Sequence, residues 1–295
     1  MLRFLLIGST GQIGWELRRT LPPLGKVIAP PREELDLGNS DSIRAAIRET
    51  RPQIIVNAAA FAAMNRVETQ PDRAMLVNAV APGVLAEESK RLGALLVHYS
   101  SAYVFDGTGV RPYKEDDAPN PINAYGRSKL AGERAIVAAG GDHIIIRLSW
   151  IHSLRGTNFL SAILQAAREK REIPVVNDQI GSPTWARTVA AATARVLQAW
   201  RPADVRRGIF HLSASGRVSR SGFAEEIIAT GQRVSGDTAM WARVKPVASA
   251  DYPLPAARPK YCVLDNTKVR EAFGIEMPGW RSEVTGCVAE RFTAT

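Results

Sequence analysis

The 295-residue sequence contains only two cysteines, Cys262 and Cys287, and no long hydrophobic run. Two such cysteines give neither metal-site spacing nor a framework of disulfide bonds, so we expect buried thiols in a reducing cytoplasm. No apolar stretch approaches the length that crosses a membrane, and the apolar run at 2–7 is too short for a signal peptide. These absences predict a cytoplasmic protein with no membrane association.

Blocks of basic residues interleaved with aromatics are also missing, although the net charge is +9. Lysines and arginines are scattered along the chain, so nucleic-acid binding is not expected. Positive charge of this kind serves anionic small molecules equally well. The length and the 45% hydrophobic fraction predict a substantial core in one body with two lobes.

Short, continuously apolar runs alternate with helical patterns over the first half of the chain. Such runs are typical of parallel strands covered by helices on both faces, so the pattern predicts a doubly wound, Rossmann-type α/β sheet. The expected strands are 2–7, 26–29, 53–57, 94–99, 143–147 and, later, 208–212, and the expected helices include 42–49, 74–91 and 125–139.

The regular alternation weakens after residue 150, where a second lobe is expected to begin. We predict a dinucleotide-binding domain over 1–150 plus roughly 180–215. The remaining segments, 151–179 and 216–295, are predicted to form a smaller, partly discontinuous α/β lobe that binds the substrate.

Three glycines follow the first expected strand, in the order Gly8-Ser9-Thr10-Gly11-Gln12-Ile13-Gly14. Glycines at such a strand-to-helix turn allow the backbone to approach a pyrophosphate, and the helix N-terminus offers it free N–H groups. The spacing is Gly-x-x-Gly-x-x-Gly. Alone, it is about as compatible with a structural turn as with a nucleotide site.

Tyr125 and Lys129 stand four residues apart and so share one face of a helix. A phenol titrates near ~10, and moving its pKa to about 7 requires roughly 4 kcal/mol of differential stabilisation of the phenolate. A nearby ammonium group and a hydroxyl donor can supply this. Ser100 or Ser101 is the candidate hydroxyl. Together with the glycine turn, these residues predict reduction of a carbonyl group.

With these residues in place, the sequence resembles the extended short-chain dehydrogenase/reductases and, within them, the dTDP-4-dehydrorhamnose reductase family. The resemblance runs nearly end to end. It is carried by segments 8–14, 57–60, 98–101, 103–105, 123–126, 129–133, 147–150, 177–179 and 181–184 and by Arg258-Pro259.

The resemblance implies NADPH or NADH as cofactor and a dTDP-linked 4-keto-6-deoxy sugar as substrate. It places the catalytic hydroxyl on Ser101, makes Tyr125 the proton donor, and gives Lys129 a second role at the nicotinamide ribose. The implied cofactor-binding residues are Gly8, Thr10, Gly11, Gln12, Ile13, Gly14, Arg32, Asp36, Leu37, Ala58, Ala59, Ala60, Asn78, Tyr125 and Lys129. The implied substrate-binding residues are Ser101, Ala102, Trp150, Asn158 and Arg258.

The loop after the second strand bears on the choice of cofactor. A carboxylate there selects the ribose 2′-hydroxyl of NADH, whereas an arginine accommodates the 2′-phosphate of NADPH. After the strand come Pro30, Pro31 and Arg32, followed by Glu33 and Glu34. On the strength of Arg32, we expect NADPH to be accepted at least as well as NADH. Asp36 and Leu37 fall where similar proteins contact the adenine.

Three positions depart from the family pattern. Ala102 replaces the usual aspartate after the catalytic hydroxyl, and Asn65 replaces a carboxylate near the sugar site. Some relatives hold magnesium at a dimer contact through a residue matching Glu16, but here Arg187 stands where an acidic partner is expected. An ion pair, or no contact at all, is therefore expected in place of a metal, and magnesium is doubtful.

Two other functions remain open from the sequence. One is a catalytically silent nucleotide-binding subunit, similar to the regulatory subunit of methionine adenosyltransferase. The other is a sugar-nucleotide epimerase or dehydratase with no net redox change. Intact Ser101, Tyr125 and Lys129 favour the reductase, because a binding module needs no acidic phenol. We expect a monomer or a weak homodimer.

Overall fold

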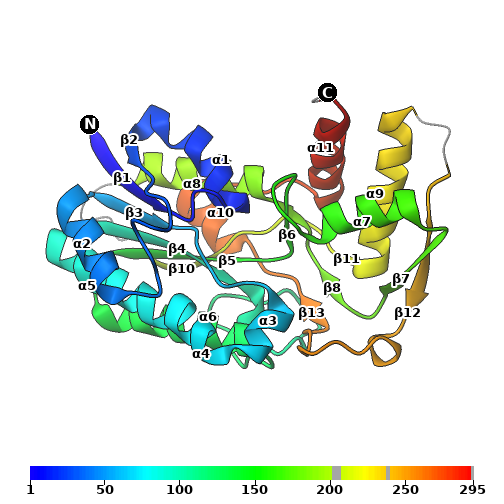
Figure 1. The fold of residues 1–295 in the computed structure, drawn as a ribbon, viewed down its shortest axis with the longest axis horizontal. Coiled ribbons are helices and arrows are strands. Elements are labelled where there is room, and N and C mark those ends of the chain that lie inside the picture. The colour runs from blue at the N-terminus through cyan, green and yellow to red at the C-terminus, as the bar shows by residue number, and fades with distance from the viewer. Residues whose placement is uncertain (201–206, 237–239, 294–295) are drawn as a thin grey trace.

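A computed structural model describes residues 1–200, 207–236 and 240–293 of the chain. Six parallel strands form its central sheet, in the spatial order β10-β5-β4-β3-β1-β2 (Figure 1). These strands are β1 (Leu2–Ile7), β2 (Gly25–Ile28), β3 (Ile54–Asn57), β4 (Leu95–Ser101), β5 (His143–Leu148) and β10 (Gly208–His211).

Helices cover both faces of this sheet, which explains the apolar character of its strands on both sides. Phe4 and Val97 pack toward one group of helices, whereas Leu5 and Ile55 pack toward the other. The first group comprises α1 (Gln12–Thr20), α8 (Ala186–Ala199) and α10 (Thr267–Phe273). The second comprises α2 (Ser40–Thr50), α5 (Ala81–Leu92) and α6 (Ala124–Ala139).

The strand order reverses next to β1. The chain runs from β1 outward to β2 and then crosses back to β3 on the other side of β1. In sheets of this type, ligands bind in the crevice at the carboxyl ends of the strands where the order reverses. The predicted doubly wound sheet is thus confirmed, and its crevice lies between the segments that follow β1 and β3.

A smaller lobe packs beside the carboxyl ends of the strands (Figure 1). Its apolar core includes Phe223, Ile227, Trp241 and Val284. Its helices are α7 (Phe159–Glu169), α9 (Arg220–Ser235) and α11 (Trp280–Thr293). Its short strands are β6 (Ile151–His152), β7 (Glu172–Val176), β8 (Ile180–Gly181), β9 (Thr184–Trp185), β11 (Val218–Ser219), β12 (Arg243–Val247) and β13 (Tyr261–Cys262). The boundaries predicted between the two domains stay a prediction.

The helix predicted over 74–91 is divided into three pieces. These are α4 (Pro71–Met75), a π-helical turn η2 (Leu76–Val80), and α5. In η2 the Ala81 N–H donates to the carbonyl of Leu76, five residues back. The next residue, Pro82, has no N–H to continue an α-helical ladder, which accounts for the widened turn.

The remaining short elements are α3 (Met64–Thr69) and the 3₁₀ turns η1 (Pro22–Leu24), η3 (Ala102–Val104) and η4 (Ser249–Asp251). Both cysteines are free and buried, as predicted. Within the described part of the chain, every helix is too short or too polar to pass through a bilayer.

Candidate active site

The start of α6 is fixed against the sheet by short-range contacts. Asn123 caps the helix by accepting from the Gly126 N–H at 2.8 Å. A Cβ on Gly126 would lie 2.0 Å from the Tyr103 carbonyl oxygen, so glycine is required for this close approach. Further along the helix, Glu133 forms a buried bidentate pair with Arg147 of β5 at 2.7 and 2.9 Å. Together these contacts hold the side chains of the first two turns in place.

Ser101 and Tyr125 meet at the carboxyl edge of the sheet. The Ser101 hydroxyl, at the end of β4, accepts from the Tyr103 N–H at 3.1 Å. Burial raises the pKa of Tyr125 to about 12, and the nearby Ser101 hydroxyl opposes this rise in pKa. The Ser100 hydroxyl is buried and has no hydrogen-bond partner among the residues described. The contacts therefore favour Ser101 as the partner of Tyr125.

Lys129 lies one turn beyond Tyr125 and is only 1% exposed. Its Nζ is 3.0 Å from Nε2 of His98, on β4. Burial lowers the pKa of Lys129 to about 8, and Glu133 opposes this shift. Burial is the largest influence on the pKa of Tyr125, and the Lys129 amine pairs with His98. The lowering of the Tyr125 pKa by Lys129 stays a prediction. Helical spacing places both side chains on one face but does not reveal a competing partner on the sheet.

The glycine turn after β1 is closed tightly against the loop after β3. A Cβ on Gly8, whose φ is +79°, would lie 2.6 Å from the Ala59 nitrogen, and one on Gly14 would lie 2.0 Å from the Gly8 oxygen. Gly11 precedes α1, and no side chain among the described residues caps that helix. Its first N–H groups are thus available to an anion, so the turn fits the pyrophosphate of a dinucleotide cofactor.

Thr10 of this turn is exposed and Ile13 is half-buried, while the Gln12 side chain accepts a hydrogen bond from the Ser153 hydroxyl at 3.0 Å. Ser153 follows β6, so this bond ties the turn to the start of the second lobe. Direct contacts from these three residues to a cofactor stay a prediction.

Ala58, Ala59 and Ala60 follow β3 and are partly or fully exposed. Asn78 supports this loop from η2. Its side chain accepts from the Phe61 N–H at 2.8 Å, donates to the Phe61 carbonyl at 2.9 Å and donates to the Ser128 hydroxyl at 3.0 Å. The observed role of Asn78 is to join the loop to α6, and its direct contact with a cofactor stays a prediction.

The loop after β2 places Arg32 at the surface. Its guanidinium lies 3.8 Å from the Asp36 carboxylate, and both groups are substantially exposed. Asp36 also accepts from the Gly38 N–H at 3.0 Å, whereas Leu37 is buried beneath the loop. Arg32 therefore has only a weak, solvent-screened partner and can turn to a phosphate.

Arg258 lies in a loop that Asn123 holds by donating to the Ala257 carbonyl at 2.8 Å. Its guanidinium donates to the Ala256 carbonyl at 3.0 Å and to the Asn65 side-chain oxygen at 3.1 Å. The departure at Asn65 thus replaces a carboxylate by a neutral amide beside Arg258. The positive charge of Arg258 is left less compensated, and burial lowers its pKa.

The other predicted substrate-binding residues are buried or hydrogen-bonded within the protein. Trp150, with φ of 45°, is 9% exposed and packs on Gly181, where a Cβ would lie 2.3 Å from the indole. Asn158 caps α7 and also donates to the Ser153 carbonyl at 2.8 Å. Ala102 is buried in η3. Their contacts with a substrate stay a prediction.

Arg220, the first residue of α9, was not predicted as a site residue. Its guanidinium lies 3.7 Å from the centre of the Trp150 ring. Burial raises the pKa of Tyr103, and the positive charge of Arg220 opposes this rise in pKa. Tyr103 in turn makes an edge contact with Tyr125, with ring centres 6.0 Å apart. No salt bridge to Arg220 occurs within the described ranges. Since no motif surrounds Arg220, only the fold could bring it near Trp150 and Arg258.

Arg187 of α8 bonds Glu16 at 3.2 Å and Glu290 at 2.7 Å. The predicted ion pair between Arg187 and Glu16 is therefore present. A search of the described residues gives no cluster of three or more metal-ligating side chains.

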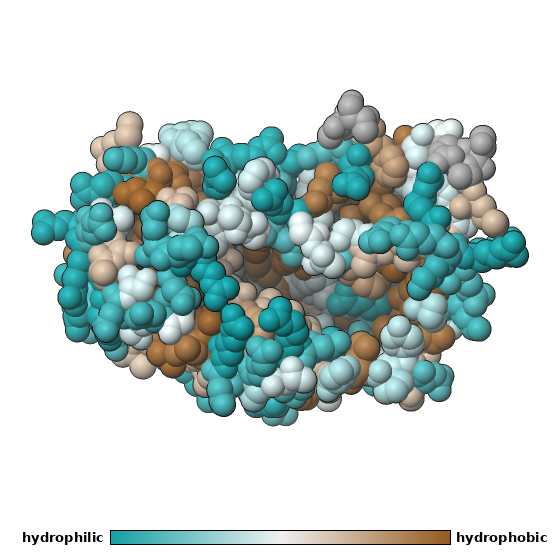
Figure 2. All heavy atoms as spheres, in the orientation of Figure 1, coloured by the Kyte–Doolittle hydropathy of each residue, from teal (hydrophilic) through white to brown (hydrophobic). Residues whose placement is uncertain are grey.

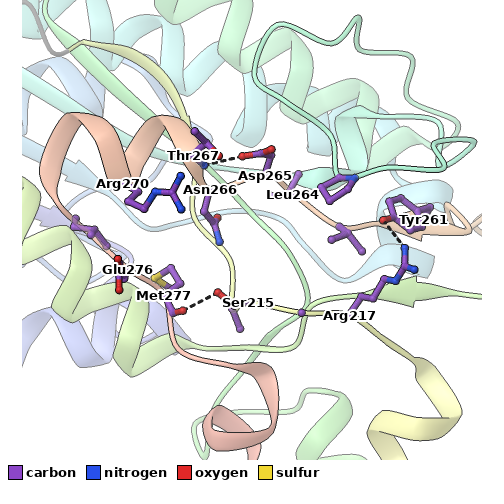
Figure 3. A pocket seen from close by; sticks show the side chains of 15 residues that line it. Ser215, Arg217, Tyr261, Leu264, Asp265, Asn266, Thr267, Arg270, Glu276 and Met277 are labelled. Atoms are coloured by element: carbon purple, nitrogen blue, oxygen red, sulfur yellow. Dashed lines mark hydrogen bonds between the residues drawn. The ribbon is translucent and has the colours of Figure 1, made fainter.

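The face of the molecule shown in Figure 2 is hollowed near its centre, between the two lobes. A separate hollow of about 640 Å³ is lined by segments that include 214–217 and 263–267 (Figure 3). There Arg217 contacts the Tyr261 hydroxyl at 3.4 Å, and Ser215 donates to the Met277 carbonyl at 2.7 Å. None of the predicted catalytic residues lines this second hollow.

Comparison with known proteins gives consistent matches over the whole chain. Residues 2–292 match the RmlD substrate binding domain family. The chain is 42% identical to dTDP-4-dehydrorhamnose reductase from Burkholderia thailandensis, over 98% of this chain and 99% of the relative. It is 38% identical to the Escherichia coli K12 enzyme of the same name, over 100% and 99% of the two chains.

Solved structures agree with this assignment. The crystal structure of dTDP-4-dehydrorhamnose reductase from Bacillus anthracis, in complex with NADP, superposes with a TM-score of 0.89 at 31% identity, and covers 99% of both chains. UDP-glucose 4-epimerase from Thermus thermophilus shares the fold, with a TM-score of 0.81 at 18% identity over 100% of both chains. The chain belongs to the dTDP-4-dehydrorhamnose reductase family.

Proposed function

We propose that this protein uses NADPH or NADH to reduce the C4 keto group of a dTDP-linked 6-deoxy sugar, converting dTDP-4-dehydro-L-rhamnose to dTDP-L-rhamnose. The observation that carries the proposal is the placement of Ser101, at the end of β4, and Tyr125, in the first turn of α6, together at the carboxyl edge of the sheet. It places a proton donor and its polar partner beside the crevice where a dinucleotide fits. The family membership of the chain supports the sugar nucleotide.

When bound, the nicotinamide cofactor would supply the hydride for the C4 carbon. The protein must place a proton on the carbonyl oxygen, and Tyr125 is the group positioned to donate it. Ser101 would turn its single hydroxyl proton to the same carbonyl oxygen, so both hydroxyls would stabilise the negative charge that develops there. Gly8 to Gly14 would hold the cofactor pyrophosphate at the start of α1, and the low exposure of Tyr125 limits the access of water to the reacting atoms.

Mixing the purified protein with NADPH and dTDP-4-dehydro-L-rhamnose is expected to consume one cofactor per sugar, seen as loss of the reduced-nicotinamide absorbance. A silent nucleotide-binding subunit would bind the cofactor and leave this absorbance unchanged. An epimerase or dehydratase would change the sugar with no net cofactor consumption. Either result contradicts the reductase.

Arg32→Ala is expected to lower the ratio of kcat/KM for NADPH to that for NADH by about 10-fold, because a charged hydrogen bond to the 2′-phosphate is lost. Initial rates with each cofactor measure this ratio. Arg48→Ala is a matched control, since Arg48 is an exposed arginine of α2 that pairs with Glu88 at 3.4 Å. An unchanged ratio in Arg32→Ala would remove Arg32 as the phosphate ligand.

Arg220 and Arg258 form the basis of the substrate side of the proposal. Burial raises the pKa of Tyr103, and the positive charges of Arg220 and Arg258 both oppose this rise in pKa. The two guanidinium groups also repel each other. Two like charges near one tyrosine are stabilised when an anion lies between them, and the diphosphate of a sugar nucleotide is such an anion. The Arg220 guanidinium also lies over the Trp150 ring and holds it in place as one wall of the proposed substrate site.

Arg258→Ala is expected to raise KM for the sugar nucleotide by about 10- to 100-fold, because a charge-assisted phosphate contact is lost. NADPH affinity should stay near the wild-type value. Steady-state kinetics and cofactor titration measure the two quantities, and Arg220→Ala should behave similarly. Arg281→Ala, which removes an exposed arginine that pairs with Glu226 in the same lobe, is the control. Equal losses for sugar and cofactor would place the substrate elsewhere.

A further inference from the structure

Three buried side chains form a chain beneath the proposed active site. Asn57, the last residue of β3, pairs in register with His98 of β4. The Lys129 side chain extends to His98 from α6. The Asn57 side-chain nitrogen lies 3.1 Å from Nδ1 of His98, and the Lys129 nitrogen lies 3.0 Å from Nε2. Each residue is at most 1% exposed. The proposed reduction assigns no role to His98.

A backbone N–H fixes the direction of this chain. The Ala59 N–H donates to the side-chain oxygen of Asn57 at 3.2 Å. Because a backbone N–H can only donate, the oxygen of the Asn57 amide must face Ala59 and its NH₂ group must face His98. Nδ1 of His98 is therefore an acceptor, and a neutral ring with an acceptor at Nδ1 carries its proton on Nε2.

The Nε2–H of His98 consequently points at Lys129. An ammonium group has only N–H donors, so it would meet another donor, whereas the lone pair of a neutral amine accepts this bond. On the same helix, Tyr125 stands one turn before Lys129 and Glu133 one turn after it. Glu133 is neutralised by Arg147 of β5, and Tyr103 of η3 lies beyond Tyr125. Apart from Glu133, nothing among these described groups favours the ammonium form.

We propose that His98 is a positioning residue that holds Lys129 beside Tyr125 and, through the tautomer imposed by Asn57, favours release of the Lys129 proton. This rests on the proposed reduction, in which Tyr125 gives up one proton at each turnover. An N–H bond of the Lys129 ammonium breaks as the O–H bond of Tyr125 forms again, and the freed electron pair on nitrogen accepts from His98 Nε2–H. A proton from solvent then restores the ammonium group.

Asn57→Asp is expected to reverse the order of donors and acceptors in the hydrogen bonds from residue 57 through His98 to Lys129, with almost no change in side-chain shape. One carboxylate oxygen keeps the bond from the Ala59 N–H, and the other accepts from His98, so the ring proton moves to Nδ1 and Nε2 becomes an acceptor for the ammonium group. The basic limb of the pH profile of kcat/KM is then expected to move up by about one unit, because Lys129 holds its proton more tightly. His98→Gln, whose amide can turn its oxygen to Lys129, should move the limb in the same direction.

Nitrogen-15 NMR of the histidine rings reads the tautomer without any catalysis, and the chain has only four histidines to assign. We expect the His98 proton on Nε2 in the wild type and on Nδ1 in Asn57→Asp. Asn39→Asp is the matched control, since the Asn39 side-chain oxygen only accepts from the Asp41 and Ser42 N–H groups at the start of α2 and lies outside the His98 contacts.

A wild-type ring protonated on Nδ1 would overturn the proposal. So would variants that change only thermal stability and leave the tautomer and the basic limb in place. If the protein fails to reduce the keto sugar, the proposed function fails, and the NMR result still shows whether Asn57 sets the state of His98.

Discussion

Tyr125→Phe is expected to lower kcat by about 10²–10⁴-fold, the usual contribution of general acid catalysis, while cofactor binding stays nearly unchanged. The change removes one hydroxyl but keeps the ring that packs edge-on against Tyr103. Single-turnover oxidation of bound NADPH measures the chemical step, and titration of protein fluorescence measures the cofactor affinity.

Tyr99→Phe is the matched control for this experiment. Tyr99 lies on β4 two residues before Ser101, and its buried hydroxyl bonds Thr193 of α8 at 2.7 Å, on the far side of the sheet from α6. Loss of that bond should lower the melting temperature and leave turnover intact. A Tyr125→Phe protein with near wild-type turnover would show that another group donates the proton.

The sheet could be predicted from the sequence because its signals are local. A strand covered on both faces must be apolar throughout, and β1 appears at 2–7 as predicted. The helix over 125–139 begins only one residue earlier, at Ala124, because Asn123 caps it. The π-helical turn at Leu76–Val80 was not predicted, because a hydrophobic pattern carries no information about the missing backbone N–H of Pro82.

The polar contacts of the site could not be predicted in the same way. The action of Lys129 on Tyr125, four residues away, stays a prediction. His98, on a strand 31 residues earlier, could not be identified as a second partner of Lys129 from local spacing. Arg220 approaches Trp150 and Tyr103 only because α9 starts at the inner edge of the second lobe. Local spacing identifies which residue types are available, whereas the choice among partners is made by packing between distant segments.

Gly14→Ala is expected to weaken NADPH binding on the order of 100-fold, since misplacing a positioning element by about 1 Å has effects of this size. A Cβ at this position would lie 2.0 Å from the backbone oxygen of Gly8, which has no flexible side chain to move aside. The turn after β1 must then open, and its N–H groups separate from the place where the pyrophosphate fits. Titration of fluorescence with NADPH measures the loss, and circular dichroism checks that the sheet is intact.

A graded series makes this test specific to the turn. A Cβ on Gly11 would lie 3.3 Å from the same Gly8 oxygen, so Gly11→Ala should cause a smaller loss of affinity. A Cβ on Gly279 would have open space around it, so Gly279→Ala should leave binding and folding unchanged. If Gly14→Ala folds and binds NADPH as tightly as Gly279→Ala, the pyrophosphate does not lie at the start of α1. The proposed cofactor-binding site would then be wrong, whatever the activity of the Tyr125→Phe protein.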